Sequence, residues 1–460
     1  MTLSLASVLA ESAQRHSDRA AIVFEGRRIS YRTLWEEARR YAHVLRALGI
    51  RPGDRVAIML GNVPDFPRAY FGILALGAVA VPVHALLTAE EVAYLLSDSG
   101  ARFVLSAEPL LPVADAGAAA ASIRAVDTAV IDADPIVGHV PREPDDDAVI
   151  LYTSGTTGSP KGAVLTHGNL VWNTTIAALD MLEATPNDVF LGALPLFHSF
   201  GQNVVMNAAF RAGACVALMQ RFNADAALEL MEREGVTIYE GVPTMTMALV
   251  EAYKRHPRNI PLRGAKSGGA SLPVAVLEEF ERLFGVPIYE GYGLSETSPV
   301  ASFNQKCFGR KPGTVGCGIW GVDLAIARAD IDDRIELLPD GELGEIVIRG
   351  HNIFKGYLNK PEATAAAIVD GWFRTGDLGT RDADGFISIV DRKKDLIIRG
   401  GFNVYPREIE EVLIRHPDVA QVAVIGVPHD THGEEVVAVV VTQNANGFEA
   451  AALIEWSQQY

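Results

Sequence analysis

The sequence has only three cysteines, Cys215, Cys307 and Cys317, and no CxxC pair. An odd number of widely spaced cysteines argues against a disulfide framework or a thiolate metal site and fits a reducing compartment. We therefore expect a cytoplasmic protein.

Positive charge is also scarce. Forty Lys and Arg residues stand against 57 Asp and Glu residues, a formal charge of −17 over 460 residues. A chain this acidic is a poor candidate for broad binding to nucleic acid, so a bound anion must be held by backbone amides and a few placed cations. We expect small-molecule partners and no nucleic acid. A homodimer and a peripheral membrane contact both stay open.

No segment reads as a leader or a membrane anchor. The N-terminus lacks the basic stretch that precedes the apolar part of a secretory signal. Residues 70–87 are uncharged and long enough to span a bilayer. However, Gly72 and Gly77 interrupt this stretch, and Pro82 and His84 lie near its end. The pattern favours a buried helix followed by a buried strand, and we expect no transmembrane segment.

Apolar periodicity predicts an α/β fold. Residues 31–48 carry apolar side chains on one helical face, and strand-like runs follow at 55–60, 78–83 and 102–106 with helical patterns between them. Strands that alternate with helices imply right-handed crossovers and doubly wound, mostly parallel sheets. Residues 113–146, rich in Ala, Asp and Pro, are expected to form an irregular surface connection.

The C-terminal part has a different texture. From about residue 323, short β segments split by glycines predict a small twisted β subdomain. After Asp391, a charged stretch leads to a strand, a helix opened by Pro406, two valine-rich strands and a last helix, which predicts a small α+β lid. We predict a large N-terminal domain over residues 1–391 and a C-terminal lid over residues 392–460.

The segment YTSGTTGSPK, residues 152–161, packs small hydroxyl residues, glycines and one lysine between two apolar runs. Glycines let successive backbone N–H groups face one concavity, which binds phosphate oxygens without a large net charge. It is not a Walker loop, because no Gly-Lys-Ser/Thr opens a helix. The alternative is a plain surface turn, but the length of the run favours phosphate binding. The expected ligands are Thr153, Ser154, Gly155, Thr156, Thr157 and Lys161.

Two further segments suit a nucleotide. In YEGYGLSET, residues 289–297, Tyr292 lies between glycines and offers a ring for stacking on a base, while Glu296 and Thr297 offer the oxygen ligands that Mg²⁺ prefers. In WFRTGDLG, residues 372–379, Asp377 lies in a glycine turn and is able to accept both hydroxyls of a ribose. The alternatives are a strand end with a surface acid and an ordinary Asp turn.

One further segment matches a nucleotide-binding motif only by its glycine spacing. GCGIWG, residues 316–321, matches the G-x-G-x-x-G pattern of dinucleotide sites. No helical pattern follows it, and residues 323–330 read as a strand. We interpret it as a loop.

Together with DRKKDLIIRGGFNVYPREIEE, residues 391–411, these motifs occur in the order and at the spacing of the adenylate-forming enzymes. The chain resembles this family of acyl-CoA synthetases, luciferases and adenylation domains over nearly its whole length, and most closely a fatty acyl-CoA ligase. The resemblance implies ATP, Mg²⁺ and coenzyme A, with a fatty acid first joined to AMP and then transferred to the CoA thiol.

The resemblance also implies roles for single residues. The residues above from Thr153 to Lys161 would hold the β- and γ-phosphates. Residues that would form the adenine slot are Gly268, Gly269, Ala270, Glu290, Gly291, Tyr292 and Gly293. Asp377 and Arg392 would hold the ribose.

Catalytic and acyl-binding roles follow in the same way. Glu296 would bind Mg²⁺, Thr297 the α-phosphate, and Lys394 would lie at the hinge of the lid. His198 would lie near the substrate carboxylate and line the acyl pocket with Gly241 and Val242. Residues that would line the path of CoA are Gly400, Gly401 and Phe402.

The chain departs from the family in its lid, which lacks the family's late Thr-Gly-Lys motif before Tyr460. We expect the native reading frame to continue, and we expect the 460-residue form to adenylate poorly, by about 10²–10³ for one lost preorganised charge. A non-catalytic nucleotide- or acyl-binding protein is the alternative from another class.

The nature of the acid is less determined. Residues 189–224 contain no Asp or Glu, which argues for an uncharged, apolar acyl group, because an ammonium group would be left unpaired there. A fatty acid is the first choice. An aryl-CoA ligase and an adenylation domain that loads a carrier protein remain as alternatives.

Overall fold

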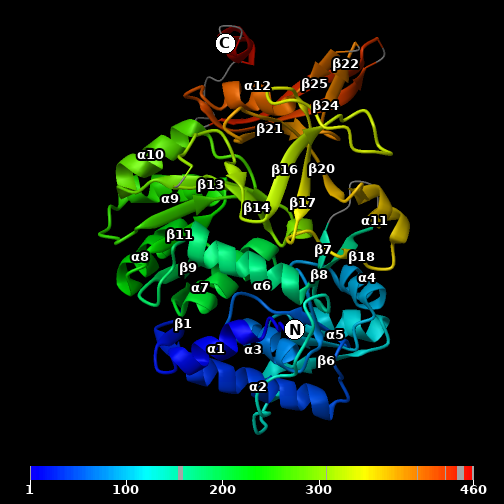
Figure 1. The fold of residues 1–460 in the computed structure, drawn as a ribbon. Coiled ribbons are helices and arrows are strands. Elements are labelled where there is room, and N and C mark those ends of the chain that lie inside the picture. Colours follow the sequence, from blue (N-terminus) through cyan, green and yellow to red (C-terminus); the bar gives the residue numbers. More distant parts are fainter. Residues whose placement is uncertain are drawn as a thin grey trace. The chain divides into compact units, whose positions relative to one another are not determined.

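The computed structural model describes residues 2–153, 159–306, 308–400, 402–429, 431–442 and 450–457. The chain divides into two compact units. Unit 1 comprises Met1–Asp323 with Arg349–Ala365, and unit 2 comprises Leu324–Ile348 with Ala366–Tyr460. Figure 1 labels their elements. The predicted domain boundary after Asp391 falls inside a strand, β21 (Ile387–Arg392), and remains a prediction.

Unit 1 contains a nine-stranded sheet in the order β15-β14-β13-β12-β11-β9-β10-β1-β2. Strands β13, β12, β11, β9, β10 and β1, which are consecutive in this order, run parallel. Strands β2, β14 and β15 are antiparallel to their neighbours. Their bounds are β1 Ala20–Phe24, β2 Arg27–Ser30, β9 Val189–Gly192, β10 Cys215–Leu218, β11 Ile238–Gly241, β12 Gly264–Ser267, β13 Ile288–Gly293, β14 Val300–Phe303 and β15 Cys317–Gly318.

A second sheet of unit 1 has seven strands in the order β18-β8-β7-β4-β3-β5-β6. The five neighbouring strands β7, β4, β3, β5 and β6 run parallel. Strand β8 is antiparallel to β7, and β18 is antiparallel to β8. Their bounds are β3 Arg55–Met59, β4 Val79–Pro82, β5 Phe103–Ser106, β6 Arg124–Asp127, β7 Asp147–Thr153, β8 Lys161–Thr166 and β18 Gly356–Tyr357. The predicted α/β class with mostly parallel sheets is confirmed.

Helices cover these sheets, and Figure 1 shows α8, α9 and α10 beside β11 and β13. Their bounds are α1 Ser7–Arg15, α2 Tyr31–Ala47, α3 Asp65–Ala75, α4 Ala89–Ser99, α5 Leu111–Ala120, α6 His167–Ile176, α7 Ala208–Ala212, α8 Ala224–Glu234, α9 Pro243–Arg255, α10 Val274–Phe284 and α11 Pro361–Ala367. Short turns of 3₁₀ or π geometry are η1 Thr128–Val130, η2 Ala177–Met181, η3 Phe200–Asn207 and η4 Ser295–Thr297.

Local sequence explains where several helices begin and end. The Ser30 hydroxyl accepts a hydrogen bond from the Thr33 N–H and so caps α2, whose buried face carries the predicted apolar residues. Thr88 and Glu91 form a capping box at the start of α4, and Gly100 ends that helix at φ 62°. These signals fix the boundaries that periodicity alone leaves uncertain.

The expectation of an irregular connection over residues 113–146 was wrong for its first part, which forms the end of α5, then β6 and η1. The physical reason is close packing of small side chains. At Gly117 of α5, an added Cβ would lie 2.6 Å from Cγ1 of Val92 on α4, so only glycine permits this approach. The alanines that suggested a loop instead form a helix pressed against its neighbour.

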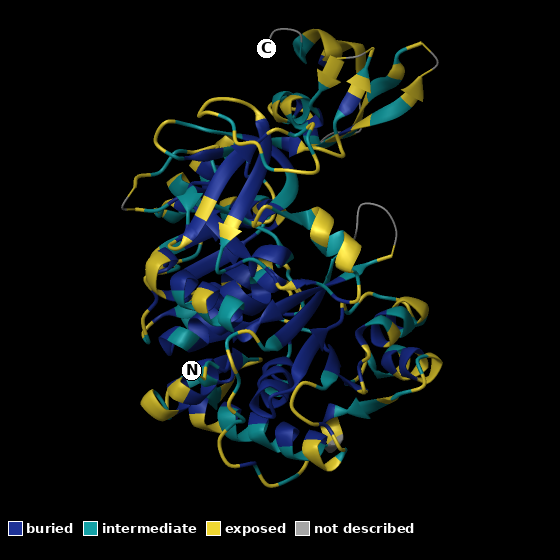
Figure 2. Ribbon diagram, turned by 45° about the vertical axis from the view of Figure 1, so that its right-hand side comes forward, coloured by how far each residue is buried: buried dark blue, intermediate teal, exposed yellow. Residues whose placement is uncertain are grey.

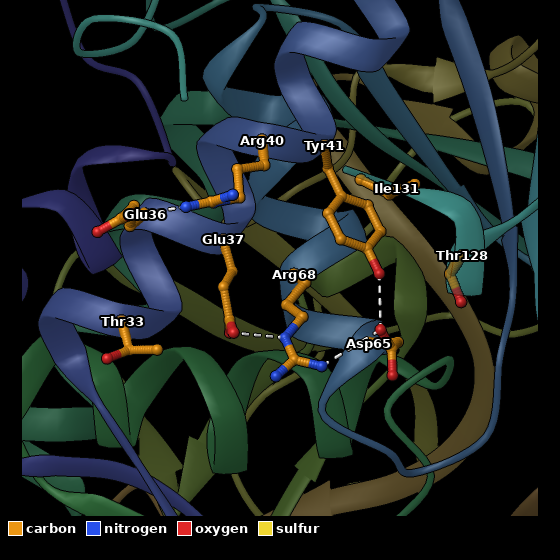
Figure 3. A pocket seen from close by; sticks show the side chains of 9 residues that line it. All are labelled: Thr33, Glu36, Glu37, Arg40, Tyr41, Asp65, Arg68, Thr128 and Ile131. Atoms are coloured by element: carbon orange, nitrogen blue, oxygen red, sulfur yellow. Dashed lines mark hydrogen bonds and ion pairs between the residues drawn. The ribbon is translucent and has the colours of Figure 1, made fainter. Parts of the chain in front are cut away.

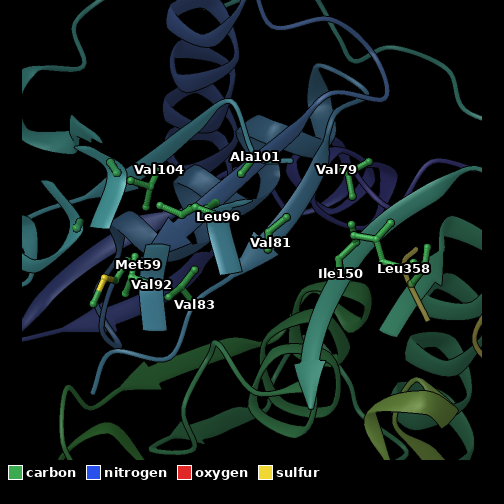
Figure 4. Packing of buried hydrophobic residues seen from close by; sticks show 14 residues of the cluster. Met59, Val79, Val81, Val83, Val92, Leu96, Ala101, Val104, Ile150 and Leu358 are labelled. Carbon is green, nitrogen blue, oxygen red and sulfur yellow. The ribbon is translucent and has the colours of Figure 1, made fainter. Parts of the chain in front are cut away.

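An apolar cluster fills the space between the seven-stranded sheet and helices α4 and α5 (Figure 4). Its buried members include Met59, Val81, Leu96, Val104 and Ile150. Figure 2 shows the strands of unit 1 largely buried and the outer helix faces exposed. Within the uncharged segment at residues 70–87, residues 70–83 are buried and contribute to α3 and β4, whereas His84 and Leu86 are exposed. None of the helices in the described ranges combines the length and apolar character needed to cross a bilayer.

The described residues of unit 2 form two smaller sheets and two helices. One sheet joins β16 Val322–Ala327, β17 Gly344–Gly350, β20 Trp372–Arg381, β19 Ile368–Val369 and β21. The other has the order β23 Phe402–Val404, β22 Ile397–Arg399, β25 Gly433–Thr442 and β24 Val419–His429. The helices are α12 Pro406–Leu413 and α13 Ala450–Ser457. A strand, β16, and not a helix follows GCGIWG directly. This confirms the prediction of a strand after the motif, which argued against a dinucleotide fingerprint.

Candidate functional site

The ends of the phosphate-binding segment lie at the tips of two paired strands. Thr153 ends β7 and Lys161 begins β8, and the two residues are directly opposite each other in the antiparallel ladder. This pairing follows from the two apolar runs that flank the glycine-rich segment. Ser154, Gly155, Thr156 and Thr157 lie outside the described residues. Both described ends are half-buried.

Glu296 is the residue on which these groups converge. It lies in η4, directly after β13, and its side chain is buried. The Thr153 hydroxyl donates a hydrogen bond of 3.3 Å to Glu296 Oε1, and the Tyr357 hydroxyl donates one of 2.9 Å to the same oxygen. The sequence placed Thr153 and Glu296 in one site, and in the structure they are in contact.

Tyr357 was missed by the sequence analysis. It lies on β18, which pairs with β8 so that Tyr357 stands opposite Ala163. The Lys161 ammonium lies over the Tyr357 ring, 4.6 Å from its centroid. Burial, and then the nearby Glu296 carboxylate, raise the pKa of the Tyr357 phenol, so the hydroxyl remains a donor at neutral pH. No local motif marks this residue, because its place depends on strand pairing.

Thr297 is fully buried beside Glu296. Its hydroxyl accepts a hydrogen bond of 2.8 Å from the Leu294 N–H and donates to the carbonyls of Leu294 and Pro299. In this structure the hydroxyl is therefore used to close the turn that presents Glu296. The expected contact of Thr297 with an α-phosphate remains a prediction.

Buried amide side chains hold this turn from behind. The Asn173 side chain donates to the Val300 carbonyl at 2.8 Å and accepts from the Val300 N–H at 3.3 Å. Asn203 donates to the Ser298 carbonyl at 2.8 Å, and Asn352 donates to the Val300 carbonyl at 3.1 Å. All three asparagines are at most 1% exposed. This asparagine network was not predicted, since isolated asparagines carry no pattern.

The expected adenine segment has tight backbone packing. A Cβ at Gly293 would lie 1.8 Å from the Pro299 carbonyl oxygen, so the close approach requires glycine. Tyr292 is half-buried on β13, opposite Ser302. The Glu290 carboxylate is buried and accepts from the backbone N–H groups of Leu272 and Gly313, both at 3.2 Å. Glu290 therefore braces loops here, and its contact with a base remains a prediction.

The expected acyl and adenine residues meet where β11 and β12 end. The Gly268 N–H donates to the Gly241 carbonyl at 3.1 Å, and a Cβ at Gly268 would lie 3.2 Å from the Phe200 ring. Val242 is half-buried at the start of α9, and Gly269, at φ 81°, and Ala270 are exposed.

His198 lies just before η3, and its ring is exposed to solvent. Its Nδ1 accepts a hydrogen bond of 3.2 Å from the Phe200 N–H, which leaves Nε2 as the protonated nitrogen of the neutral ring. Desolvation by neighbouring protein atoms, and then the charge of His84, lower the pKa of His198. A neutral imidazole able to donate from Nε2 suits a contact with a carboxylate.

In unit 2, Asp377 and Arg392 stand opposite each other on β20 and β21. Arg392 Nε lies 3.3 Å from Asp377 Oδ1, with the carboxylate buried and the guanidinium more than half exposed. Lys394 is exposed in the turn that follows. Gly400 has φ 58°, Phe402 is 78% exposed, and Gly401 lies outside the described residues.

Unit 2 also holds a group of side chains of the types that bind metals. Ligand atoms of His429, His432 and Glu435 lie within 4.8 Å of one another. Arg399 already forms an ion pair with Glu435 at 2.5 Å, and His429 Nδ1 accepts backbone N–H groups. A metal here would have to displace these contacts.

A polar cavity of about 400 Å³ lies between α2, α3 and η1 of unit 1 (Figure 3). Its cations are paired within it: Arg68 with Glu37 at 2.8 Å and Arg40 with Glu36 at 2.8 Å. None of its lining residues belongs to the predicted site. The lining residues are Thr33, Glu36, Glu37, Arg40, Tyr41, Asp65, Arg68, Thr128 and Ile131.

Comparison with known proteins identifies relatives along most of the chain. A family model described as AMP-binding enzyme matches residues 9–358, and one described as AMP-binding enzyme C-terminal domain matches residues 408–459. A long-chain-fatty-acid–CoA ligase of Bacillus subtilis (strain 168) is 35% identical, covering 95% of this chain and 85% of the relative. A feruloyl-CoA synthase of an Amycolatopsis species is 37% identical, covering 95% and 88%. The crystal structure of ATP-bound MatB from Rhodopseudomonas palustris has a TM-score of 0.91 at 34% identity, covering 100% of this chain and 92% of that chain.

Proposed function

Because this chain belongs to the AMP-binding enzyme family, with acyl- and aryl-CoA ligases among its relatives, we propose that it is an ATP-dependent fatty acyl-CoA ligase. In the first half-reaction a carboxylate oxygen attacks the α-phosphorus of ATP, and pyrophosphate leaves. In the second, the CoA thiolate attacks the acyl carbon and AMP leaves. Formation of the adenylate turns a poor electrophile into one with a good leaving group.

One observation carries the proposal: Thr153 and Lys161, the two ends of the glycine-rich segment, lie beside Glu296 together with Tyr357. This arrangement joins a cation, a set of hydroxyl donors and a carboxylate in one place. A triphosphate with a divalent cation requires that combination. Lys161 and the hydroxyl residues would bind the β- and γ-phosphates.

The residues around Glu296 fit Mg²⁺. Both hydrogen bonds to its carboxylate fall on Oε1, so its second oxygen accepts none from the described residues. Carboxylate and hydroxyl oxygens are the ligands that Mg²⁺ prefers. Bound there, Mg²⁺ would neutralise charge on the phosphates, and Tyr357 would keep the Glu296 side chain in position.

The remaining roles follow the resemblance. Tyr292 would stack on adenine, Asp377 and Arg392 would hold the ribose, and His198 would donate from Nε2 to the substrate carboxylate. Lys394 would serve as hinge next to the proposed boundary after Asp391, and the segment from Gly400 to Phe402 would line the path of CoA. The few unpaired cysteines support a cytoplasmic location.

The acid is proposed from composition and from the Bacillus relative. Residues 189–224 supply no carboxylate, and an apolar lining gains about 0.8 kcal/mol per buried methylene, or about fourfold in kcat/KM. The test is pyrophosphate release by the protein with fatty acids from butyrate to stearate. Rates that rise with chain length support a fatty acid, and rates independent of length contradict it.

An aryl acid is the second candidate, and the feruloyl-CoA synthase relative at 37% identity favours it. An apolar lining does not distinguish a ring from a chain. Adding benzoate and cinnamate to the same series separates the two. AMP formation on CoA, compared with AMP formation on a carrier protein, identifies the acceptor.

A further inference from the structure

A charged pair lies inside the nine-stranded sheet, shortly before Gly241, expected to line the acyl site, and Gly268, expected to line the adenine slot. Glu240 on β11 and Lys266 on β12 are opposite each other in the parallel register. Glu240 is fully buried and Lys266 is 7% exposed. Both residues lie outside the carboxylate-free stretch at residues 189–224, and strand pairing brings them together.

The Glu240 carboxylate and the Lys266 ammonium do not form a hydrogen bond with each other. Neither carboxylate oxygen of Glu240 has a hydrogen-bond partner among the described residues. No hydrogen bond or ion pair joins the Lys266 ammonium to another described residue, and it lies 4.1 Å from the centroid of the Tyr289 ring. Burial raises the pKa of Glu240 and lowers that of Lys266. An uncompensated buried charge costs several kcal/mol, so a group that bonds to both has much to gain.

The pair faces the side of the sheet that η3 covers, next to the expected acyl residue His198. Side chains alternate along a strand, so Lys266 and position 268 face the same side of β12. On that side, Gly268 approaches the Phe200 ring of η3, two residues after His198. Val242, expected to line the acyl site, comes two residues after Glu240 and so follows the same alternation, whereas Gly241 faces Tyr239 on the opposite side of β11.

We infer that Glu240 and Lys266 determine specificity by binding a hydroxyl group on the acyl part of the acid, remote from its carboxylate. This inference rests on the proposed ligase function. A hydroxyl is able to donate to the Glu240 carboxylate and accept from the Lys266 ammonium at once. A second carboxylate would be repelled by Glu240, an ammonium by Lys266, and a methyl group would leave both charges unpaired. The substrate class is therefore a hydroxylated carboxylic acid, either a hydroxy fatty acid or a phenolic acid.

The test compares acids that differ only in this hydroxyl. The protein is assayed for pyrophosphate release with dodecanoate against 12-hydroxydodecanoate and with cinnamate against 4-hydroxycinnamate. A site built around a hydroxyl rejects the analogue that lacks it, so we expect a preference of at least about 10² in kcat/KM in one of the two arms. The arm that shows the preference identifies the body of the acid, alkyl or aryl.

Variants test whether the pair causes the preference. In the double variant Glu240→Leu with Lys266→Met, we expect the preference to fall below about tenfold and the unsubstituted acid to gain, because apolar replacement of both partners is tolerated. Glu240→Gln keeps the shape and one acceptor and is expected to retain an intermediate preference. The matched control, Glu251→Leu with Lys254→Met, removes an exposed pair on α9 and is expected to leave the preference unchanged. Thermal unfolding confirms that each variant folds.

Three results overturn the inference, and each is distinct from the others. Equal kcat/KM for the hydroxylated and unsubstituted acid in both arms, with clear pyrophosphate release, removes the role of the pair and leaves the ligase proposal standing. A preference that survives in the double variant does the same. Absence of pyrophosphate release with every acid overturns the ligase proposal, and the inference with it.

Discussion

The Tyr357 hydroxyl donates a hydrogen bond of 2.9 Å to Glu296 Oε1 across 61 residues of sequence, and the same phenol ring underlies the Lys161 ammonium. Tyr357 thus touches both charged residues of the proposed triphosphate site. It couples the position of a carboxylate to the position of a cation.

Replacement of this hydroxyl is the first prediction. In Tyr357→Phe we expect kcat for pyrophosphate release to fall about tenfold, since one hydrogen bond to a charged group contributes about 1.5–3 kcal/mol. The ring, and with it the Lys161 contact, is retained. Tyr253→Phe is the matched control, because the Tyr253 hydroxyl donates to the Arg258 carbonyl, which lies beyond the C-terminal end of α9. Unchanged rates in Tyr357→Phe would remove its positioning role.

Glu296→Gln tests the proposed Mg²⁺ contact. We expect activity to fall by about 10²-fold, as for loss of one preorganised group, and the Mg²⁺ concentration for half-maximal rate to rise. A chelator is expected to abolish pyrophosphate release by the unmodified enzyme. The exposed Glu278→Gln on α10 serves as control. If the Mg²⁺ requirement of Glu296→Gln equals that of the unmodified enzyme, Glu296 does not bind the metal.

Gly293→Ala tests the close approach of the adenine segment to the Pro299 carbonyl. A methyl group there would meet that oxygen at 1.8 Å, so the backbone must shift, at a cost of about 1–3 kcal/mol. We expect a lower melting temperature and a raised KM for ATP, because Tyr292 and Glu296 flank the glycine. Gly264→Ala on β12 is the control, since no atom lies within 4 Å of the added methyl. Equal effects of both substitutions would contradict the packing argument.

The buried ion pair of Asp188 predicts a pH dependence of stability. Arg263 lies 2.6 Å from Asp188, and Thr185 and Thr237 also donate to the carboxylate. Burial alone would raise the Asp188 pKa, but these hydrogen bonds lower it to about 2. Because this lies below the ordinary Asp value of about 4, the stabilisation is complete above about pH 4 and is lost as the pH falls from about 4 toward 2.

Asp188→Asn therefore lowers the free energy of unfolding by about 2–3 kcal/mol at neutral pH. The difference in the free energy of unfolding between the variant and the unmodified protein should narrow as the pH falls below about 4, as measured by denaturant unfolding. Asp225→Asn, which breaks an exposed pair with Arg255, is expected to change stability little at any pH. A difference in unfolding free energy between Asp188→Asn and the unmodified protein that stays constant down to pH 3 would show that Asp188 is not the titrating group.

Sequence was a good guide where the determinants are local. The helix over residues 31–48 and the strands near 55 and 79 have both a clear apolar period and a buried face, so they were predicted almost to the residue. Thr153 and Lys161 were placed together because they are the two ends of one hairpin. The connection at 113–146 was misjudged, because an alanine-rich segment acquires its helical structure by packing on α4.

Contacts that depend on the pairing of strands far apart in the sequence could not be predicted. Tyr357 reaches Glu296 only because β18 adds to the edge of β8, and nothing in the local sequence states which strand it joins. Glu240 and Lys266 face each other by the register of β11 against β12. Such contacts depend on how distant segments meet, and a sequence without relatives does not contain that information in its local pattern.

The asparagine network behind Glu296 has one consequence for how this enzyme responds to acidity. Carboxamide groups neither gain nor lose a proton in water near neutrality, so the framework that presents the carboxylate holds the same geometry in mildly acidic and mildly alkaline solution. A bell-shaped rate profile would therefore reflect ionisation of the reacting groups themselves, with the scaffold acting as a fixed frame.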